Sequence, residues 1–517
     1  MANTQLFKST KGPLLPKTNM VNEAGGRAYQ LAPEQALAQY AVTGCLSQTF
    51  YADAETQLET VLELCAKVEP RFLAKAAVYC RQQGYMKDMP ALLAAMLTTR
   101  GQEFLPQVFG QVVDNGKMLR NFVQILRSGA VGRKSLGSRP KKLVQGWLNT
   151  ASEKALLHAS VGNAPSLADV VKMVHPRPTE DWREAWFAWL IGKPYEEAAL
   201  PPLTRAFEAY KRDRTQPLPD VPFQMLTALE LGTKEWTDIA RSGGWQMLRM
   251  NLNTFARHGV FEDAAQCKLV ATQLADRQAV LKARAFPYQL MMAFQSVAAS
   301  VPHEVRDALQ DAMEVALENV PACVGKVVVC PDVSGSMSSA ATGFRGAATS
   351  KVRCIDVAAL VAAAFVRKNG NTVVLPFETK VVDITLNPRD SVMSNAKKLA
   401  SIGGGGTNCS APLAWLNQNR VKADLVVMVS DNESWVDTRK TGATETQCQW
   451  ERFSQENPQA KLVCVDIQPH AHTQAAERED ILNVGGFSDA VFKIIASFAN
   501  GRLGPQHWVG VIDEVML

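Results

Sequence analysis

Residues 326–336 read KVVVCPDVSGS, and this stretch decides the fold of the C-terminal part of the chain. Its valine run predicts a short buried strand, because β-branched residues favour the extended backbone of a sheet. Pro331-Asp332 ends this strand, and a polar loop follows. An apolar helix is expected next, from Cys354 to Lys368, where Asn369-Gly370 stops it.

The alternation of strand and helix continues to residue 466. Such alternation predicts βαβ units and a mainly parallel, buried sheet, which is an α/β Rossmann-like fold. Ligands of these folds bind at the carboxyl ends of the strands. Further strands are expected at Thr372–Leu375, around Val381–Ile384, at Leu425–Val429 and at Leu462–Asp466, with helices at Ser391–Ala400, from the Gly403–Gly406 turn through Trp415, and between the last two strands.

Five oxygen-bearing side chains follow the ends of these segments. Asp332, Ser334 and Ser336 come after the first strand, Thr407 comes after four glycines, and Asp431 follows the second long valine strand. Carboxylates combined with hydroxyls suit a hard cation that keeps some of its waters. We therefore expect one divalent cation here, Mg²⁺ first, with Mn²⁺ or Ca²⁺ as alternatives.

The order D-x-S-x-S, then T, then D, each at a strand end, resembles the metal-ion-dependent adhesion site of von Willebrand factor A domains. The resemblance implies such a domain over residues 323–517. Two other interpretations stay open: Asp332 and Ser334 cap turns, or the fold is intact and holds no metal. Catalysis is the weakest reading, because metal hydrolases need an activating base or a second ion and Glu433 is a single acidic neighbour, more often a solvated or supporting group.

Residues 30–320 predict an all-helical region. Glu55–Cys65, Arg71–Tyr79 and Pro90–Leu97 are examples, and in the first of them the apolar residues recur at three- and four-residue spacing. Pro and Gly interrupt the chain at short intervals, which favours short helices paired by tight turns. Helix pairs of about 40 residues fit HEAT-like units, which stack into a curved solenoid or a ring.

Length and composition indicate an ordinary globular protein of more than one domain. The chain has 517 residues, of which 47% are hydrophobic and 20% charged. It shows neither a signal peptide nor an apolar stretch of membrane-spanning length, so a cytoplasmic protein without a membrane partner is expected. The ten cysteines form no C-x-x-C pair, which favours reduced thiols.

The net charge of +5 lies entirely in residues 1–322, and within them the basic residues are concentrated between Asp114 and Glu153. No acidic residue occurs between Asp114 and Glu153. A stretch of one sign attracts polyanions, although a solvated face is the alternative. Trp147 is expected in the core, so phosphate and shape recognition is favoured over base reading. The basic residues of the stretch are Lys117, Arg120, Arg127, Arg133, Lys134, Arg139, Lys141 and Lys142.

Several segments resemble the TROVE module of the Ro autoantigen family. They are Asn22–Tyr29, Arg71–Leu97, Lys172–Pro178, Val221–Met225 and Gly244–Leu252. With a C-terminal A domain the order of parts also matches, so the resemblance covers nearly the whole chain and places the TROVE module at residues 1–322.

The resemblance implies a ring of helical repeats whose ends the A domain joins. It also implies a non-enzymatic, monomeric protein that binds Y-like noncoding RNA on its outer surface and 3′ ends of misfolded RNA in its hole, with polynucleotide phosphorylase as a partner in bacteria. The run Gly132–Lys142 falls where the family contacts the RNA backbone. His175 falls in the family's His-x-x-Pro loop, followed by Arg177; here an extra Pro176 departs from that pattern.

A second class of function stays open. The A domain captures an acidic residue of a partner protein through its metal, and the helical part serves as a docking scaffold. In both cases Met225, Met247 and Met250 are expected to fill the core rather than to line a channel.

Overall fold

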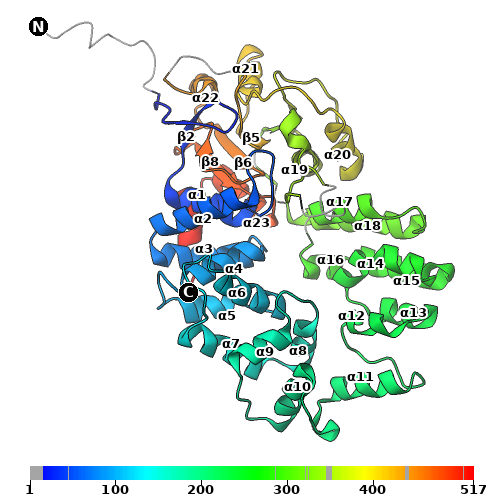
Figure 1. Cartoon of the computed structure of the whole chain (residues 1–517). Helices are drawn as coiled ribbons and strands as arrows, with labels where there is room; N and C mark the ends of the chain where they lie inside the picture. The colour runs from blue at the N-terminus through cyan, green and yellow to red at the C-terminus, as the bar shows by residue number, and fades with distance from the viewer. Residues whose placement is uncertain are drawn as a thin grey trace, which may run out of the picture.

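The computed structural model describes residues 15–44, 46–285, 287–320, 322–323, 325–344, 352–436, 442–504 and 506–517. Among these residues, no helix is both long and apolar enough to cross a membrane. Figure 1 shows two arms of helices and an α/β domain that bridges them at the top. No disulfide joins the nine cysteines that are described, which agrees with the predicted reduced thiols.

The first arm runs down one side of the molecule and confirms the three helices given as examples. Asp53 and Asn115 begin two of its helices, because their side chains accept the backbone N–H groups of Thr56 (2.8 Å) and Met118 (3.1 Å). Gly129 ends the second of these at φ +89°. The helices are α1 (Pro33–Thr43), α2 (Ala54–Lys67), α3 (Pro70–Gln82), α4 (Asp88–Met96), α5 (Leu105–Val112), α6 (Gly116–Ser128), α7 (Ser138–Thr150), α8 (Glu153–Ser160), α9 (Leu167–Val174) and α10 (Asp181–Ile191).

The second arm returns on the opposite side, so the helical part is an arc rather than a straight stack (Figure 1). Its helices are α11 (Pro202–Arg212), α12 (Phe223–Leu226), α13 (Thr233–Ser242), α14 (Trp245–Arg257), α15 (Ala264–Ala275), α16 (Arg277–Ala283), α17 (Pro287–Ser296) and α18 (His303–Ala316).

The α/β domain is built on a five-stranded parallel sheet. In spatial order the strands are β4 (Val373–Val374), β3 (Val327–Pro331), β5 (Leu425–Ser430), β6 (Lys461–Asp466) and β8 (Ile481–Gly485). Both faces of this sheet are buried, which explains why its strands are continuous apolar runs. Its helices are α19 (Cys354–Lys368), α20 (Val392–Ala400), α21 (Ala411–Gln418), α22 (Glu445–Glu456), α23 (Asp489–Ala499) and α24 (His507–Asp513).

One predicted strand was wrong. Residues 381–384 form no strand; Val381 makes a single bridge to Phe377 and the segment continues as a loop. A run of four residues without a neighbouring strand cannot form a ladder, whatever its propensity. The sheet instead gains β8, which the prediction lacked.

The α/β domain contacts both ends of the helical arc and closes it into a ring. On one side, strand β2 (Arg27–Gln30), which follows β1 (Met20–Val21), pairs antiparallel with β7 (His472–Thr473). On the other side, Glu314 of α18 accepts the backbone N–H of Val392 (3.0 Å). Strand β3 begins at Val327, just after the predicted domain boundary between residues 322 and 323. The N-terminal segment that carries β2 nevertheless packs on the α/β domain.

Candidate metal centre and basic surface

The structure brings the five predicted metal ligands together at the carboxyl ends of β3 and β5. Asp332 Oδ1 accepts the backbone N–H of Ser334 (2.8 Å), and its Oδ2 accepts the hydroxyl of Ser430 (2.6 Å). Thr407 donates its hydroxyl to Ser334 Oγ (3.0 Å), which lies 3.4 Å from Ser336 Oγ. All five side chains are buried. Three segments far apart in sequence thus share one polar cluster.

The four glycines before Thr407 explain how that residue reaches the cluster. Gly404 donates its N–H to the Val333 carbonyl (3.0 Å), and the Gly405 carbonyl accepts from Gly335 (3.1 Å). Gly405 has φ +73°, and a Cβ at this position would collide with the Glu378 carboxylate. Only glycine allows this conformation and this close approach of two loops.

In the part of the chain that the structure describes, no cationic side chain pairs with the two carboxylates. Burial raises the pKa of Asp332 to about 6, and burial together with the charge of Asp332 raises the pKa of Asp431 to about 8. Asp431 Oδ2 has no hydrogen-bond partner among the described residues. A buried carboxylate in this state is stabilised by a nearby cation. The donor set of two carboxylates and three hydroxyls therefore fits a divalent cation.

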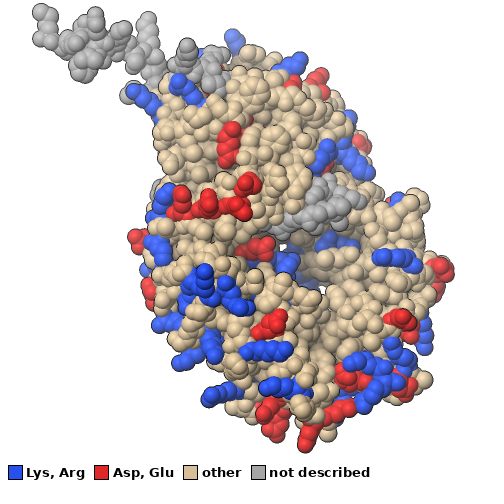
Figure 2. Space-filling view, viewed as in Figure 1, with Lys and Arg blue, Asp and Glu red and all other residues tan. Residues whose placement is uncertain are grey.

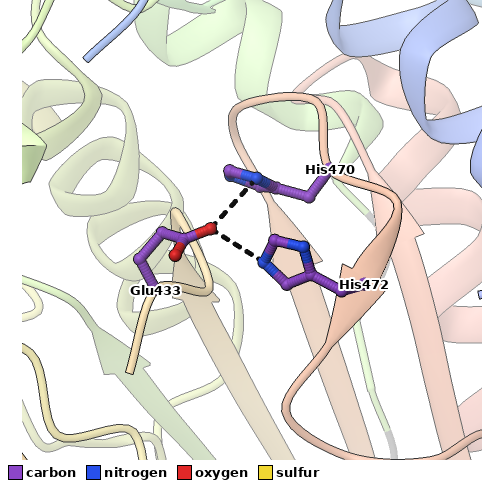
Figure 3. A group of neighbouring side chains, drawn as sticks. All are labelled: Glu433, His470 and His472. Atoms are coloured by element: carbon purple, nitrogen blue, oxygen red, sulfur yellow. Dashed lines mark hydrogen bonds and ion pairs between the residues drawn. The ribbon is translucent and has the colours of Figure 1, made fainter. Parts of the chain in front are cut away.

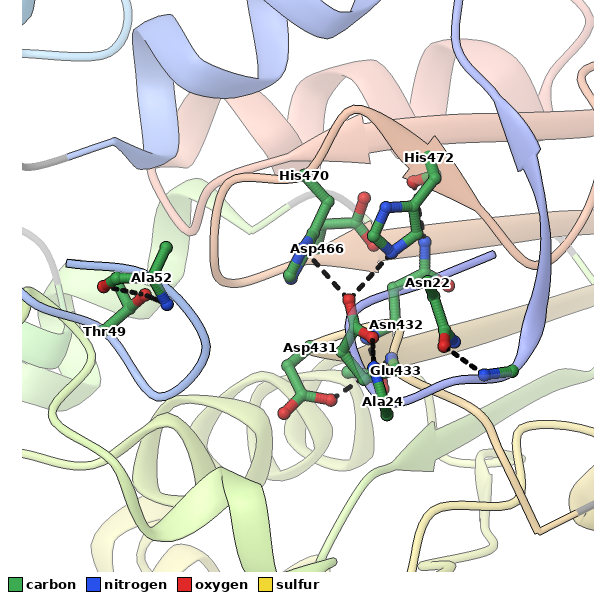
Figure 4. Close-up of polar contacts among 12 residues, drawn as sticks. Asn22, Ala24, Thr49, Ala52, Asp431, Asn432, Glu433, Asp466, His470 and His472 are labelled. Carbon is green, nitrogen blue, oxygen red and sulfur yellow. Dashed lines mark hydrogen bonds and ion pairs between the residues drawn. The ribbon is translucent and has the colours of Figure 1, made fainter. Parts of the chain in front are cut away.

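Tyr51, in the loop between α1 and α2, also belongs to this site and was not predicted. Burial raises the pKa of its hydroxyl most, the charge of Asp431 raises it further, and a hydrogen bond with Ser336 lowers it. The backbone of the same loop is held by Phe344, whose N–H donates to Gln48 (3.0 Å). Figure 4 shows Asp431 on the side of the site that faces this loop. Nothing in the sequence around Tyr51 indicates this contact.

Glu433 is buried and does not lie free in a solvated loop. Its Oε1 lies 2.8 Å from Nε2 of His472 and 3.2 Å from Nδ1 of His470, and its Oε2 accepts the N–H of Ala24 (3.0 Å). Figures 3 and 4 show the carboxylate between the two imidazole rings and the N-terminal segment. The side chain is occupied by these contacts, so it is not available as a base for water at Asp431.

The predicted basic residues lie on α6, on α7 and on the loop between these helices. Lys and Arg side chains gather on the corresponding part of the surface in Figure 2. Five of them are exposed, and for four of these five no hydrogen bond or ion pair of the side chain occurs within the described ranges; we call these four the α6–α7 basic surface. They are Lys117, Arg127, Lys134 and Lys142.

Three predicted cations instead donate hydrogen bonds to backbone carbonyls of the protein. Arg120 donates to the Val161 carbonyl (2.7 Å), and partial burial lowers its pKa. Arg133 donates to the Ser135 carbonyl (3.0 Å), and Arg139 to that of Gln102 (2.7 Å). Sequence reasoning assigned all eight to one class, because the spacing of basic residues does not tell which guanidinium meets a carbonyl. Lys141 is half-buried in the first turn of α7.

His175 and Arg177 are exposed and lie in a loop beside α7. His175 ends α9 at φ +50°, and its carbonyl accepts the side-chain amide of Gln145 (3.2 Å). The Arg177 carbonyl lies 3.4 Å from Nδ2 of Asn149. Because Gln145 and Asn149 belong to α7, the His-Pro-Arg-Pro loop adjoins the α6–α7 basic surface.

One of the three methionines was placed wrongly. Met250 is 72% exposed, and it lines a cavity of about 1060 Å³ with Met247, which is half-buried. Pro219 and Pro222, in the linker before α12, line the same cavity. Met250 therefore lies on the exposed side of α14, whereas Leu248, Leu252 and Phe255 of the same helix are buried.

Comparisons with known proteins agree with this architecture. Residues 326–499 match the family described as the Ro60 vWA domain. A protein named RNA-binding protein RO60 from Deinococcus radiodurans is 25% identical over 528 residues, which cover 95% of this chain and 97% of that protein. One of the same name from Caenorhabditis elegans is 21% identical over 245 residues, or 45% of this chain and 37% of that protein.

A solved structure is similar to the whole ring. The crystal structure of the Deinococcus radiodurans RO (RSR) protein matches with a TM-score of 0.61 and 21% sequence identity, over 91% of this chain and 100% of that chain. Residues 326–499 therefore have the fold of a von Willebrand A domain and match its Ro60 type, and the resemblance of the chain to Ro proteins extends along nearly its whole length.

Proposed function

We propose that this chain is a non-enzymatic RNA-binding protein of the Ro type. The observation that carries the proposal is the α6–α7 basic surface, where four exposed cations lie on two consecutive helices and their loop, in a stretch of sequence without acidic residues. Cations of this kind neutralise phosphates and release counterions, which favours a polyanion over a protein partner. The names of the two relatives agree with this class of ligand.

The finer parts of the proposal concern which RNA is bound and where. Y-like noncoding RNA would bind the outer α6–α7 basic surface, together with His175 and Arg177 on the adjoining loop. A single-stranded 3′ end of a misfolded RNA would enter the ring, and the bound RNA would present the complex to an exoribonuclease such as polynucleotide phosphorylase. We place the protein in the cytoplasm and expect it to be a monomer.

A salt titration tests the RNA surface. In one variant Lys117, Arg127, Lys134 and Lys142 are changed to Ala; in a control of equal charge change, Lys193, Lys268, Lys380 and Lys493 are changed, which are exposed elsewhere. Loss of four phosphate contacts lowers the slope of log K against log salt by roughly 3. The proposal requires this loss in the first variant and a wild-type slope in the control. Equal slopes for both variants and the wild type refute it.

We also propose that Asp332, Ser334, Ser336, Thr407 and Asp431 hold one Mg²⁺ ion. The orphaned Asp431 Oδ2 supports this proposal. The bound ion would offset the two buried carboxylates and accept an acidic ligand from a partner.

The scaffold interpretation rests on this site alone, and it predicts a protein ligand that is released by EDTA in a chain that binds no RNA. If RNA is the ligand and the A-domain metal plays no part in it, RNA affinity survives EDTA.

A further inference from the structure

Glu433, His470 and His472 form a second cluster of possible metal ligands. One oxygen of Glu433 and one nitrogen of each imidazole all lie within 4.8 Å of one another, and the three residues are buried. Glu433 follows β5, whereas the histidines lie in the loop after β6 and in β7 (Figure 3). Two separate segments therefore bring one carboxylate oxygen and two imidazole nitrogens close together.

Hydrogen bonds leave this cluster incomplete. Glu433 and His472 satisfy each other at 2.8 Å, whereas neither ring nitrogen of His470 meets hydrogen-bond geometry with a partner among the described residues, although the ring lies near the backbone of Asp431. Its Nδ1 lies 3.2 Å from Glu433 Oε1, outside the directions that allow a hydrogen bond. Burial lowers the pKa of His470 to about 4. A buried polar ring that lacks partners needs an explanation, and a bound ion is one.

The surrounding charge also calls for a cation. Four carboxylates are buried here, those of Asp332, Asp431, Glu433 and Asp466. Within the described ranges, no lysine or arginine forms an ion pair with any of the four, and the ion-pair partners of Glu433 are His470 and His472. A cation held by Asp332 and Asp431 would offset two of the carboxylates. Glu433 would stay beside the two imidazoles, which are themselves metal-ligand side chains.

We propose that Glu433 Oε1, His470 Nδ1 and His472 Nε2 bind a zinc ion, at a site distinct from the predicted Mg²⁺ site. Two imidazoles and one carboxylate form a donor set that selects Zn²⁺ over Mg²⁺, because Mg²⁺ prefers oxygen ligands only. Zinc bonds of about 2.0–2.2 Å put tetrahedral donors roughly 3.3 Å apart, so Glu433 Oε1 has to move outward slightly from His472. The proposal does not depend on RNA binding.

The ion would fasten the N-terminal segment onto the A domain. Glu433 Oε2 accepts the N–H of Ala24, and His472 pairs with Gln30 in the β2–β7 ladder. An ion that fixes Glu433 and His472 therefore fixes both contacts of this segment. Its place at the junction of three chain segments is typical of a structural site rather than of a catalytic one.

Zinc retention in the presence of Mg²⁺ tests the proposal. The full chain, stripped with a chelator, is given Zn²⁺ with a large excess of Mg²⁺, desalted, and its zinc content is measured by mass spectrometry. The wild type is expected to keep one equivalent. His470→Gln and His472→Gln remove an imidazole but keep a polar side chain, and each is expected to lose the zinc. Asp332→Asn, the matched control in the other site, is expected to keep it.

Two results overturn the proposal: a wild type that keeps no zinc, or histidine variants that keep as much as the wild type. Because a buried variant can fail to fold, X-ray absorption at the zinc edge on the wild type gives an independent reading. Scattering from imidazole rings is expected there. A shell of oxygen scatterers alone would place the zinc at Asp332 and Asp431 and refute the site.

Discussion

Trp508, in the last helix of the chain, donates its indole N–H to the hydroxyl of Tyr79, 429 residues earlier, at 3.2 Å. Both side chains are buried, the first in α24 and the second in α3. Burial raises the pKa of Tyr79 to about 12, so the hydroxyl stays protonated and needs a partner. The C-terminal helix is thereby held on the first arm of the ring.

Replacing Trp508 by Phe is expected to destabilise the protein by about 2–4 kcal/mol, since it removes packing volume and leaves the Tyr79 hydroxyl unpaired. Urea unfolding of Trp508→Phe, Tyr79→Phe and the double variant measures this. Their coupling free energy should be about 1 kcal/mol. Additive effects would mean that the hydrogen bond contributes nothing.

The metal-free protein is expected to lose stability as the pH rises from about 4 to about 8. The folded pKa values of Asp332 and Asp431 lie above the ordinary value of 3.8, at about 6 and about 8. In this window these two groups bind more protons in the folded than in the unfolded state, which outweighs the opposite contribution of His470, so the free energy of unfolding falls with rising pH. Urea unfolding in EDTA at several pH values measures the trend.

Saturating Mg²⁺ should flatten that profile, because the ion stabilises the ionised carboxylates. Asp431→Asn should flatten it without Mg²⁺ and should remove the stabilisation by Mg²⁺. A wild type whose unfolding free energy rises with pH in EDTA would contradict the electrostatic account.

Arg120 and Lys117 are expected to behave in opposite ways, although they are three residues apart on α6. Arg120→Ala leaves the carbonyl of Val161 without its donor and should cost about 1–3 kcal/mol of stability. Lys117→Ala should leave stability unchanged within about 0.5 kcal/mol and reduce the salt slope of RNA binding by about 1. Thermal melts and RNA titrations of both variants separate the two roles. Equal effects on stability would contradict the assignment.

Gly405→Ala is expected to disturb the metal site through the backbone. The substitution meets both a positive φ and the Glu378 carboxylate, so a destabilisation of roughly 1–3 kcal/mol and weaker Mg²⁺ binding should follow. Gly370→Ala is the control, since its added Cβ meets no atom within 4 Å. Calorimetric titration with Mg²⁺ compares the two variants, and equal affinities would count against the loop as a support of Thr407.

The sheet was predictable where burial on both faces leaves a run of apolar β-branched residues. β3, β5 and β6 have this property. Asp332 directly follows β3, and Asp431 directly follows β5. β8 reads ILNVG, and its central Asn483 interrupts the pattern although that side chain is buried in hydrogen bonds with Thr473 and Glu477. A buried Asn is tolerated in a strand only when other residues of the fold form hydrogen bonds with it. The local sequence pattern does not show which residues these are.

The candidate sites divide in the same way. Asp332, Ser334 and Ser336 form a short motif with its own spacing, so they could be predicted together. His470 and His472 meet Glu433 only because β5 and β6 are neighbours, and each looks ordinary in its own segment. Tyr51 reaches the A domain from the opposite end of the chain, and Arg120 is distinguished from Lys117 only by the loop that folds against it.

The β2–β7 ladder also sets an order of events during synthesis. Tyr29 of β2 pairs with Thr473 of β7, so β2 leaves the ribosome long before its partner strand has been synthesised. At about 5–20 residues per second, the wait is on the order of 20–90 s. Throughout that interval the helices can form only an open arc. A polymer lying across the arc when the A domain finally folds would be encircled without having to thread an end.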